Sequence, residues 1–221
     1  MLLGIKDDFN VCSIPTKQAK PWILKKHYAS RIPPICHSFG LYRNNEIVGV
    51  CTFGQGARAF EEKWDSVEVC ELNRLITEDN LPKNALSYFV SRTLKMLPSP
   101  MLIVSYADPN KGHHGYIYQA TNWIYVGLTN KRRKFINENG EQIHERTMVS
   151  RYGSASKEVA QKNNIEIKKQ KGKHKYFYII GNKKEKKKIK NIINIKPKPY
   201  PKGDNEKYDT GDKVVKQQRL F

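Results

Sequence analysis

The stretch that most constrains the fold of this chain is an apolar run, Met101–Val104, that is stopped soon afterwards at Asp108 and a following proline. A short apolar run bounded by turn signals is typical of a strand buried inside a sheet. Next come His113 and His114 between two glycines, and then Tyr118 on a short helical stretch. A carboxylate, two imidazoles and a phenol thus follow the carboxyl end of a strand, where open α/β sheets place their chemistry. The pattern predicts a functional site.

Helical and strand-like stretches follow one another without a regular repeat. Residues 67–77 alternate like a strand, residues 85–97 carry the apolar stripe of a helix, and Asn44-Asn45 predicts a hairpin turn. The expected helices are 16–28, 85–97, 113–122, 156–163 and 183–193, and the expected strands are 38–43, 46–53, 67–77, 101–107, 123–128, a hairpin within 134–143, and a hairpin-like pair at 165–169 and 175–180. This order predicts an α/β fold of the α+β kind with one mixed layer, and not a Rossmann repeat.

The positive charge of the chain is concentrated in its C-terminal part. The formal net charge is +19, yet residues 1–150 hold 19 basic and 14 acidic side chains, residues 151–202 hold 17 and 3, and residues 203–221 hold 4 of each. A block of this kind is the electrostatic footprint of a polyanion, with nucleic acid as the first candidate, while the alternative is a lysine-rich tail that only aids solubility. We expect a catalytic core (1–153), a basic nucleic-acid-binding extension (154–202) and a flexible tail (203–221).

Cysteine usage and hydropathy indicate the compartment. No apolar run approaches the roughly twenty residues of a membrane span, and the N-terminus lacks the pattern of a signal peptide. The four cysteines are scattered without a CxxC pair, and Cys51 and Cys70 lie in strand-like runs. We therefore expect reduced core thiols in a cytoplasmic protein without a membrane partner, and a zinc ribbon is not supported.

A series of ordered motifs covers roughly residues 20–202. They are Lys26-His27-Tyr28, Phe39-Gly40-Leu41-Tyr42, Gly49-Val50 through Phe53-Gly54-Gln55-Gly56-Ala57, Glu71-Leu72-Asn73-Arg74-Leu75, Ser105-Tyr106-Ala107-Asp108-Pro109, Gly112-His113-His114-Gly115, Ile117-Tyr118-Gln119-Ala120, Asn122-Trp123, Ser150-Arg151-Tyr152-Gly153, His174 to Tyr178, and the lysine-rich run followed by Pro-Tyr-Pro. In these motifs the chain resembles the phage Mom DNA-modification family.

That resemblance implies a GNAT-like acyltransferase fold with a central mixed sheet and a basic C-terminal extension. It also implies a transferase that converts adenine in double-stranded DNA to its N6-carbamoylmethyl (methylcarbamoyl) form and so protects phage DNA from host restriction. Such an enzyme would act in the cytoplasm of an infected or prophage-carrying bacterium. The alternative is a GNAT-type N-acyltransferase for a protein or tRNA amine. A non-catalytic DNA-binding protein would not explain why Asp108, His113, His114 and Tyr118 share one loop region.

In a GNAT-like fold, the donor's pyrophosphate binds at the N-terminus of the helix that follows the long strand. The usual glycine-rich turn is absent from this sequence, which leaves acetyl-CoA and another acyl or glycyl carrier as alternatives. The candidate cofactor-binding residues are Arg74, Lys83, Asn84 and Ser87. Ser87 could equally be an ordinary residue of the first helical turn.

His27 and Asp108 are expected to share the cleft of such a fold. A histidine with a carboxylate forms either a general-base dyad or part of a non-haem metal site, and the resemblance favours iron or another divalent metal. Tyr118 and Tyr42 are the further catalytic candidates, as proton donors or as stacking partners of a flipped adenine, with half-buried core tyrosines as the alternative. The candidate substrate-binding residues are Glu71, Asn73, Tyr106, His113 and His114.

Basic clusters are expected to hold the DNA backbone without reading its sequence. These are Lys131, Arg132, Arg133 and Lys134 between two strands, and Lys186, Lys187 and Lys188 in the lysine-rich run. The last five residues, QQRLF, resemble bacterial sliding-clamp-binding peptides, with Gln217 at the pocket rim and Leu220 and Phe221 as apolar anchors.

Overall fold

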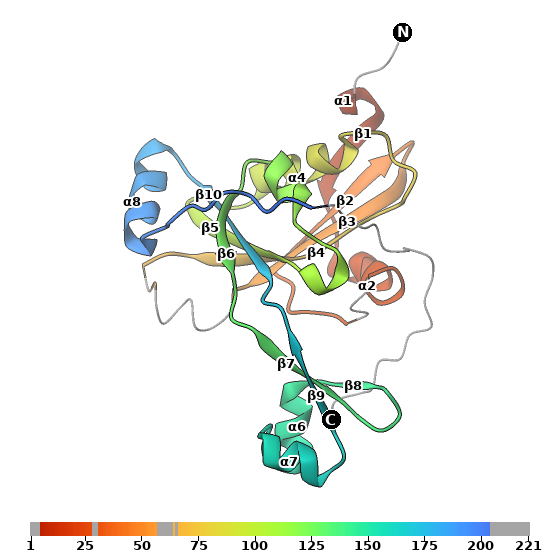
Figure 1. The fold of residues 1–221 in the computed structure, drawn as a ribbon. Helices are drawn as coiled ribbons and strands as arrows, with labels where there is room; N and C mark the ends of the chain where they lie inside the picture. Colours follow the sequence, from red (N-terminus) through yellow and green to blue (C-terminus); the bar gives the residue numbers. More distant parts are fainter. Residues whose placement is uncertain (1–4, 28–30, 57–63, 65, 204–221) are drawn as a thin grey trace.

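A computed structural model describes residues 5–27, 31–56, 64 and 66–203. A seven-stranded mixed sheet forms the main body, in the order β1-β2-β3-β4-β5-β10-β6 (Figure 1). Neighbouring strands are antiparallel except β4 and β5, which are parallel. The strands are β1 (Phe9–Ser13), β2 (His37–Arg43), β3 (Glu46–Gln55), β4 (Val69–Thr77), β5 (Met101–Ala107), β6 (Ile124–Leu128) and β10 (His174–Ile180). The predicted α+β fold with a central mixed sheet is confirmed.

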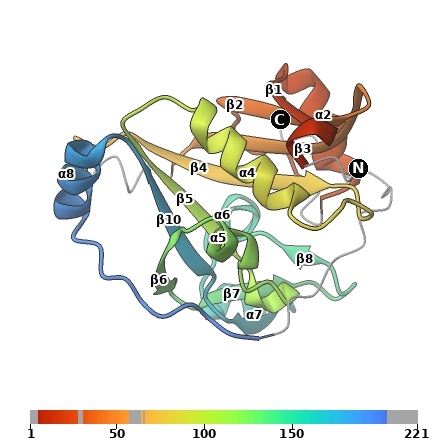
Figure 2. The same cartoon turned by 90° about the horizontal axis from the view of Figure 1, so that it is seen from above.

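Helices cover both faces of this sheet. They are α1 (Ile5–Asp8), α2 (Thr16–Lys25), α4 (Ala85–Met96), α5 (Tyr116–Ala120) and α8 (Lys183–Ile193), with a short 3₁₀ turn η1 (Pro109–Lys111). Ile103 of β5 packs in one core with Phe89 of α4, whereas its neighbour Leu102 packs in a second core with Ile189 of α8. Because successive strand residues point to opposite faces, α4 and α8 lie on opposite sides of the sheet. Figure 2 shows α4 running across the sheet and α8 beyond its far end.

The turn between β2 and β3 and the buried strand β5 match their predictions closely. Asn44 and Asn45 have φ of 50° and 65°, as a two-residue hairpin turn requires. Residues Met101–Val104 are buried on both faces, which explains their continuous apolar run. The predicted helix 16–28 is shorter in the structure, since α2 ends at Lys25.

A second, three-stranded sheet forms a small lobe, residues 132–170, that extends from the main body (Figure 1). Its strands β7 (Arg132–Ile136), β8 (Gln142–Ile143) and β9 (Glu166–Gln170) are ordered β8-β7-β9. Helices α6 (Glu145–Tyr152) and α7 (Lys157–Lys162) complete it. The lobe has a core of its own, in which Phe135 and Met148 are fully buried. The lobe interrupts the body, because β6 leads into β7 and β9 leads back into β10.

Two sequence predictions are therefore wrong. Residues 165–169 and 175–180 do not pair with each other, because β9 pairs with β7 in the lobe while β10 pairs with β5 and β6 in the body. Residues 154–202 also do not form a separate basic extension after a core of 1–153. Strand β10 lies inside the main sheet, so the core is incomplete without it.

The stretch after α8 runs along the outer edge of the main sheet. Lys198 donates its backbone N–H to the carbonyl of Tyr125 at 2.9 Å, and the Tyr200 hydroxyl donates to the carbonyl of Trp123 at 2.7 Å. These two hydrogen bonds hold the proline-rich stretch against β6. In the part of the chain that the structure describes, no helix is long and apolar enough to cross a membrane.

The four cysteines are free thiols, as the sequence predicts, and they differ in accessibility. Cys51 is fully buried, whereas Cys36 is exposed. Burial raises the pKa of the Cys51 thiol and raises that of Cys70 to about 12. Because the thiolate is the reactive form, both are expected to resist alkylation in the folded protein.

We therefore expect iodoacetamide at pH 8 to modify Cys36 first and to reach Cys51 and Cys70 only after unfolding. Mass spectrometry of tryptic peptides, taken over a time course with and without guanidinium, measures this order. Labelling of Cys51 in the folded chain as fast as Cys36 would contradict the packing of β3.

Candidate active site

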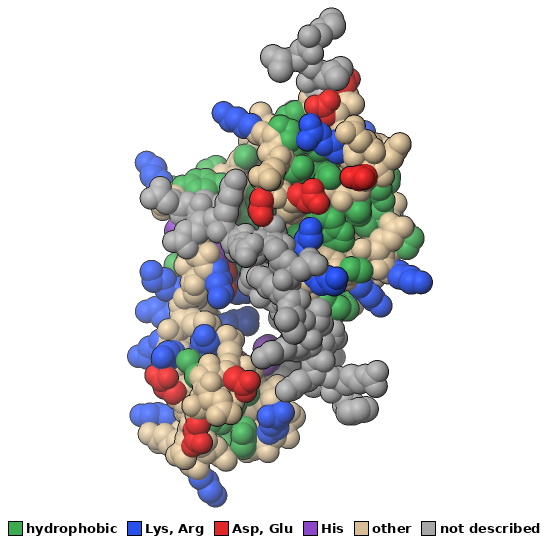
Figure 3. Space-filling model, turned by 90° about the vertical axis from the view of Figure 1, so that its right-hand side faces the viewer, with side chains coloured by type: hydrophobic (Ala, Val, Ile, Leu, Met, Phe, Trp, Pro, Cys, Tyr) green, Lys and Arg blue, Asp and Glu red, His purple; other side chains and the backbone are tan. Residues whose placement is uncertain are grey.

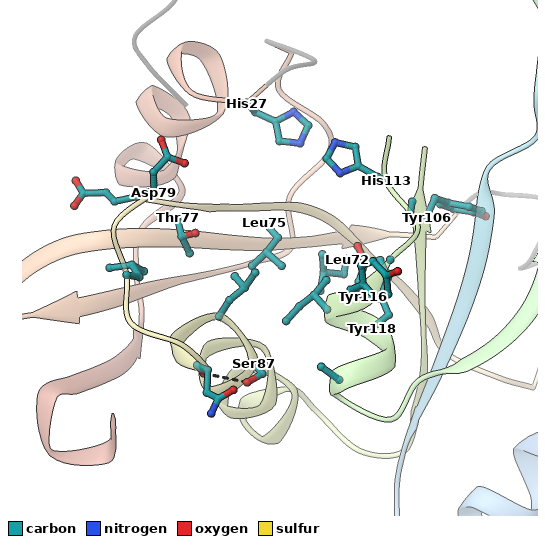
Figure 4. Close-up of a pocket in the computed structure, with 18 of the residues that line it drawn as sticks. His27, Leu72, Leu75, Thr77, Asp79, Ser87, Tyr106, His113, Tyr116 and Tyr118 are labelled. Carbon is teal, nitrogen blue, oxygen red and sulfur yellow. Dashed lines mark hydrogen bonds between the residues drawn. The ribbon is translucent and has the colours of Figure 1, made fainter. Parts of the chain in front are cut away.

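A pocket of the described chain lies where β4 and β5 part. The two strands pair only over Val69–Glu71 and Leu102–Val104, and beyond these residues a cavity of about 530 Å³ opens between them (Figure 4). It is lined by the end of each strand, by the start of α4, by α5 and by His27. Helix α2, which precedes His27, packs on Val50, while α4 packs on the neighbouring Cys51. Groups from both faces of the sheet therefore reach this gap.

A β-bulge at Asn73 bends β4 at the pocket. Thr52 and Phe53 of β3 pair with Arg74 and Leu72, which leaves Asn73 as the extra residue. The Asn73 carboxamide accepts from the Thr52 hydroxyl at 2.6 Å and donates to the Pro34 carbonyl at 2.9 Å. Asn73, which was predicted to bind substrate, lines the pocket, and its carboxamide also holds the segment before β2 against the sheet.

Arg74 has a similar holding role. Its guanidinium donates to the carbonyl of Arg31 at 2.8 Å and to that of Asn73 at 2.6 Å. Arg74 does not line the pocket, so the structure does not bring this predicted cofactor-binding residue to it. Sequence reasoning missed this cluster because its partners, Pro34 and Arg31, contribute backbone carbonyls that any residue could supply.

His27, His113 and Asp108 lie together at one end of the pocket, as predicted. His27 is only 6% exposed, and Figure 4 shows its ring and that of His113 pointing toward each other. One carboxylate oxygen of Asp108 accepts from the Asn110 backbone at 2.9 Å and from the Asn110 side chain at 2.8 Å. The other lies 3.7 Å from the Lys173 ammonium. This carboxylate is thus held in one orientation beside the two imidazoles.

His27, Asp108 and His113 are of the side-chain types that bind metal ions. Within the described ranges, no group of three or more His, Cys, Asp and Glu side chains is arranged to hold a metal ion. One Asp108 oxygen accepts from two N–H donors of Asn110 and the other lies near the Lys173 ammonium, contacts that a metal-ligating carboxylate can also make. The iron or other divalent metal at His27 and Asp108 therefore stays a prediction, and no chemical step below uses one.

Tyr118 lies at the inner wall of the pocket and is buried. Its hydroxyl is 2.7 Å from the hydroxyl of Ser105, which is itself 2.8 Å from the carbonyl of Leu72. A carbonyl only accepts, so when Ser105 donates its single proton to Leu72, Tyr118 is the donor to Ser105. Ser105 thereby bridges β4 and β5 where they begin to part and fixes the phenol. Its place in the strand gave no sign of this role.

The start of α4 forms the opposite wall. Lys83, Asn84, Leu86 and Ser87 line the pocket there. Asn84 precedes the helix with φ of 72° and makes no side-chain cap, and the Ser87 hydroxyl donates to the Asn84 carbonyl at 3.0 Å (Figure 4). The first-turn amides of α4 are thus not capped by a side chain of Asn84, and a helix N-terminus of this kind suits an anionic group. Three of the four predicted cofactor-binding residues lie here.

Several other predicted site residues lie elsewhere. Tyr42 packs beside α2 and does not line the pocket. The His114 backbone carbonyl accepts from the Tyr176 hydroxyl at 2.5 Å, and its ring lies 5.5 Å from that of His174, outside the pocket lining. Tyr106 is at the pocket edge, but Figure 4 shows its ring pointing away from the other labelled side chains.

Glu71 lies on the α8 side of the sheet, near Tyr106. Burial raises the pKa of Glu71, and the positive charges of Arg74 and Lys173 oppose this rise. Burial also raises the pKa of Tyr106, with a further increase from Glu71 and a decrease from Arg132. Glu71 and Tyr106 therefore belong to a polar cluster next to the pocket, and Glu71 does not line it.

Sequence reasoning also missed pocket residues. Thr77, Glu78 and Asp79 line the end of the pocket nearest His27, and Tyr116 lines it from α5. The three consecutive polar residues after an apolar strand were the available signal for this rim, by the same argument that identified Asp108.

The predicted DNA-binding residues fall into two separate groups. Arg132, Arg133 and Lys134 lie on β7 of the small lobe, with Lys131 directly before it. Lys186, Lys187 and Lys188 are exposed on α8 of the main body. Figure 3 shows Lys and Arg side chains gathered on the lobe and its connection to the body. The clamp-binding candidates Gln217, Leu220 and Phe221 lie outside the described residues.

Comparison with known proteins gives a family and a relative. The model of the Mom protein family matches residues 8–202. The methylcarbamoylase mom of Escherichia phage Mu is 30% identical over 197 residues, which cover 83% of this chain and 80% of that protein.

Solved structures with a related fold are acetyltransferases. A GNAT family acetyltransferase from Elizabethkingia anophelis with acetyl-CoA bound has a TM-score of 0.41 and 10% identity, covering 79% of this chain and 99% of its own. A probable acetyltransferase from Staphylococcus epidermidis has a TM-score of 0.44 and 9% identity, covering 77% and 98%. Scores at this level carry no argument about donor or substrate.

Proposed function

The chain belongs to the Mom protein family, and from this we propose that it is a transferase that converts adenine in DNA to its N6-carbamoylmethyl (methylcarbamoyl) form. The observation that carries the proposal is the pocket at the β4–β5 gap. It collects His27, His113, Asp108 and Tyr118, and it can be reached from both faces of the sheet. A reaction between two large molecules needs such a meeting point, because donor and acceptor must approach the same atoms from different sides.

The acceptor atom, N6 of adenine, is paired inside the duplex. An enzyme that acts on it must therefore extrude the base into a pocket. A cavity of about 530 Å³ is within the range of ligand pockets and has room for a base beside the end of a donor. Asp108 and His27 are placed to accept the proton that N6 loses as its new bond to carbon forms.

The donor is proposed to bind at the start of α4. The first-turn amides and Lys83 would hold an anionic part of the donor, and the donor's reactive end would extend toward Tyr118. When Ser105 instead turns its proton to the Tyr118 oxygen, 2.7 Å away, the phenol can supply its own proton to a leaving group on that side. Acetyl-CoA and another acyl or glycyl carrier both carry suitable anionic groups, and the choice between them stays a prediction.

An adenine modified at N6 would explain the predicted role, which is protection of phage DNA from host restriction. A substituted N6 projects into the major groove, where restriction enzymes contact adenine. Modified phage DNA would thereby escape cleavage in a bacterial host. Association with a sliding clamp through residues 217–221 likewise stays a prediction.

Mass spectrometry of nucleosides tests the proposal. We expect DNA from bacteria that express the full chain to contain a modified adenosine heavier by a carbamoylmethyl group, and DNA from cells with the empty vector to lack it. Hydrolysed tRNA and total protein from the same cells are analysed in parallel. An unmodified adenine pool with a new acyl group on tRNA or protein would instead favour the N-acyltransferase alternative.

A further inference from the structure

One face of the small lobe carries no helix. In the β7–β9 ladder, Arg132, Lys134 and Ile136 stand opposite Gln170, Lys168 and Glu166, while Arg133 and Phe135 stand opposite Lys169 and Ile167. Opposed residues share a face and alternate residues switch faces. Phe135 and Ile167 pack in the lobe core beneath α6 and α7, so their face is covered. The other face, which we call the open face, presents the three cations Arg132, Lys134 and Lys168.

The charges on the two faces have different surroundings. On the covered side, Arg133 lies 3.8 Å from Glu145 at the start of α6 and 5.7 Å from the Phe135 ring centroid. On the open face, Lys168 lies 3.2 Å from Glu166, and Arg132 is exposed. Arg132 and Lys134 are two residues apart on a strand and hence separated by about 7 Å, which makes a row of cations.

Two cations link the lobe to residues near the pocket. The positive charge of Arg132 acts on Tyr106, which lines the pocket with its ring turned away from the other labelled side chains (Figure 4). The ammonium of Lys173, on the strand that returns from the lobe, is 3.7 Å from Asp108. Arg132 and Lys173 thus place positive charge between the open face of the lobe and Asp108.

Asn110 fixes the lobe relative to this carboxylate. Its side-chain oxygen accepts from the Lys171 backbone N–H at 3.2 Å, and its side-chain nitrogen donates to the Lys171 carbonyl at 3.1 Å. The same nitrogen donates to Asp108. In the same connecting segment, a Cβ at Gly172 would lie 1.8 Å from the carbonyl oxygen of Thr129, which belongs to the other connecting segment, so the two segments lie in close contact. These contacts hold the connection between the lobe and the main body in one position.

We propose that the open face of the small lobe binds the phosphate backbone of duplex DNA and directs the strand to the pocket. The proposal rests on the proposed function, which supplies DNA as the partner. Charge complementarity supports it, because the face of the lobe sheet opposite α6 and α7 presents a row of cations to a polyanion, and Lys173, next to the lobe, lies 3.7 Å from Asp108 of the pocket.

The test is a comparison of two triple variants of the full chain. R132Q/K134Q/K168Q removes the open-face cations, and K157Q/K162Q/K169Q removes three exposed cations from the covered side and α7. Binding to a fluorescein-labelled 20-base-pair duplex is followed by anisotropy at several salt concentrations, and thermal unfolding confirms that both variants fold. Each phosphate contact contributes about 0.9 to the slope of log K against log salt.

For the open-face variant we expect Kd to rise about ten- to a hundredfold at 0.1 M salt and the slope to fall by about 2 to 3. The covered-side variant should change Kd by less than about threefold, because its three charges lie on the covered face of the lobe sheet or on α7 and not on the open face. Equal binding by wild type and the open-face variant would overturn the proposal, and so would equal weakening by both variants.

Nucleoside analysis of the same proteins separates this proposal from the proposed function. If wild type modifies adenine and the open-face variant binds and modifies DNA like wild type, only the surface assignment fails. If the open-face variant alone loses duplex binding but wild type leaves adenine unmodified, the surface stands and the proposed reaction fails.

Discussion

Asparagine in place of Asp108 is expected to lower the fraction of modified adenine by at least about a hundredfold, the usual range for loss of a positioned general base. Asparagine keeps the shape of the side chain and an oxygen that can accept from Asn110. What it lacks is the negative charge that faces Lys173 and that can take a proton beside His27. The D108N variant therefore separates the chemistry of the carboxylate from its role in holding the loop.

The measurement is the ratio of modified to total adenosine in DNA from cells that express each variant at equal level. Glu46→Gln is the matched control, because it also removes one carboxylate, at an exposed position at the start of β3 away from the pocket. Thermal unfolding and duplex binding of D108N should stay close to wild type. Normal modification by D108N would remove Asp108 from the reaction.

Alanine in place of Gly54 should have the largest effect on stability among the changes considered. A Cβ there would lie 2.0 Å from the Pro34 carbonyl oxygen and 2.6 Å from the Asn73 side-chain nitrogen. The first is a backbone atom and cannot turn away, so the segment before β2 must move and break the hydrogen bond from Asn73. Forced overpacking of this kind costs about 1–3 kcal/mol, and occasionally more.

Urea or thermal denaturation measures this cost, with an expected drop in melting temperature of about 2–12 °C for a chain of this size. Gly56→Ala, directly after the same strand, is the control, since its Cβ would meet the Val69 side chain at 3.0 Å, and we expect it to cost less than about 1 kcal/mol. G54A should also lose modification activity, because Asn73 forms part of the pocket wall. A G54A protein with wild-type stability would refute the close packing of Pro34 on β3.

Most of the individual elements could be predicted from the sequence because their signals are local. The Asn44-Asn45 turn, the stripe of α4 and the run of β5 each depend on neighbouring residues. Strand pairing does not depend on neighbouring residues and could not be predicted in this way. Nothing in Glu166–Gln170 or His174–Ile180 marks their partners as β7 and β5, because pairing depends on residues 30 to 79 positions away. Helix α6 was missed since few of its residues are apolar.

The candidate site was predicted in part for the same reason. His27, His113, Asp108 and Tyr118 carry chemistry in their side chains, and the structure brings them to one pocket. The side chains of Asn73 and Arg74 are of types that also occur in binding sites. In the structure they donate hydrogen bonds to the backbone carbonyls of Pro34 and Arg31, which no sequence pattern reveals. A polar residue in a strand thus indicates a demand for hydrogen bonds, but the sequence does not say whether a ligand or the protein meets it.

The place of β10 between β5 and β6 has a consequence for the order in which the protein is made. A ribosome releases β5 and β6 long before β10, and these two strands have no direct pairing with each other in the finished sheet. The edge of β5 that β10 will occupy therefore stays open while about 70 further residues are synthesised, a period in which unpaired edges invite aggregation. Catalytic competence then arises late in translation, at the moment when the returning strand closes the sheet. A fragment that ends before β10 lacks an inner strand of the main sheet, and we expect it to be inactive.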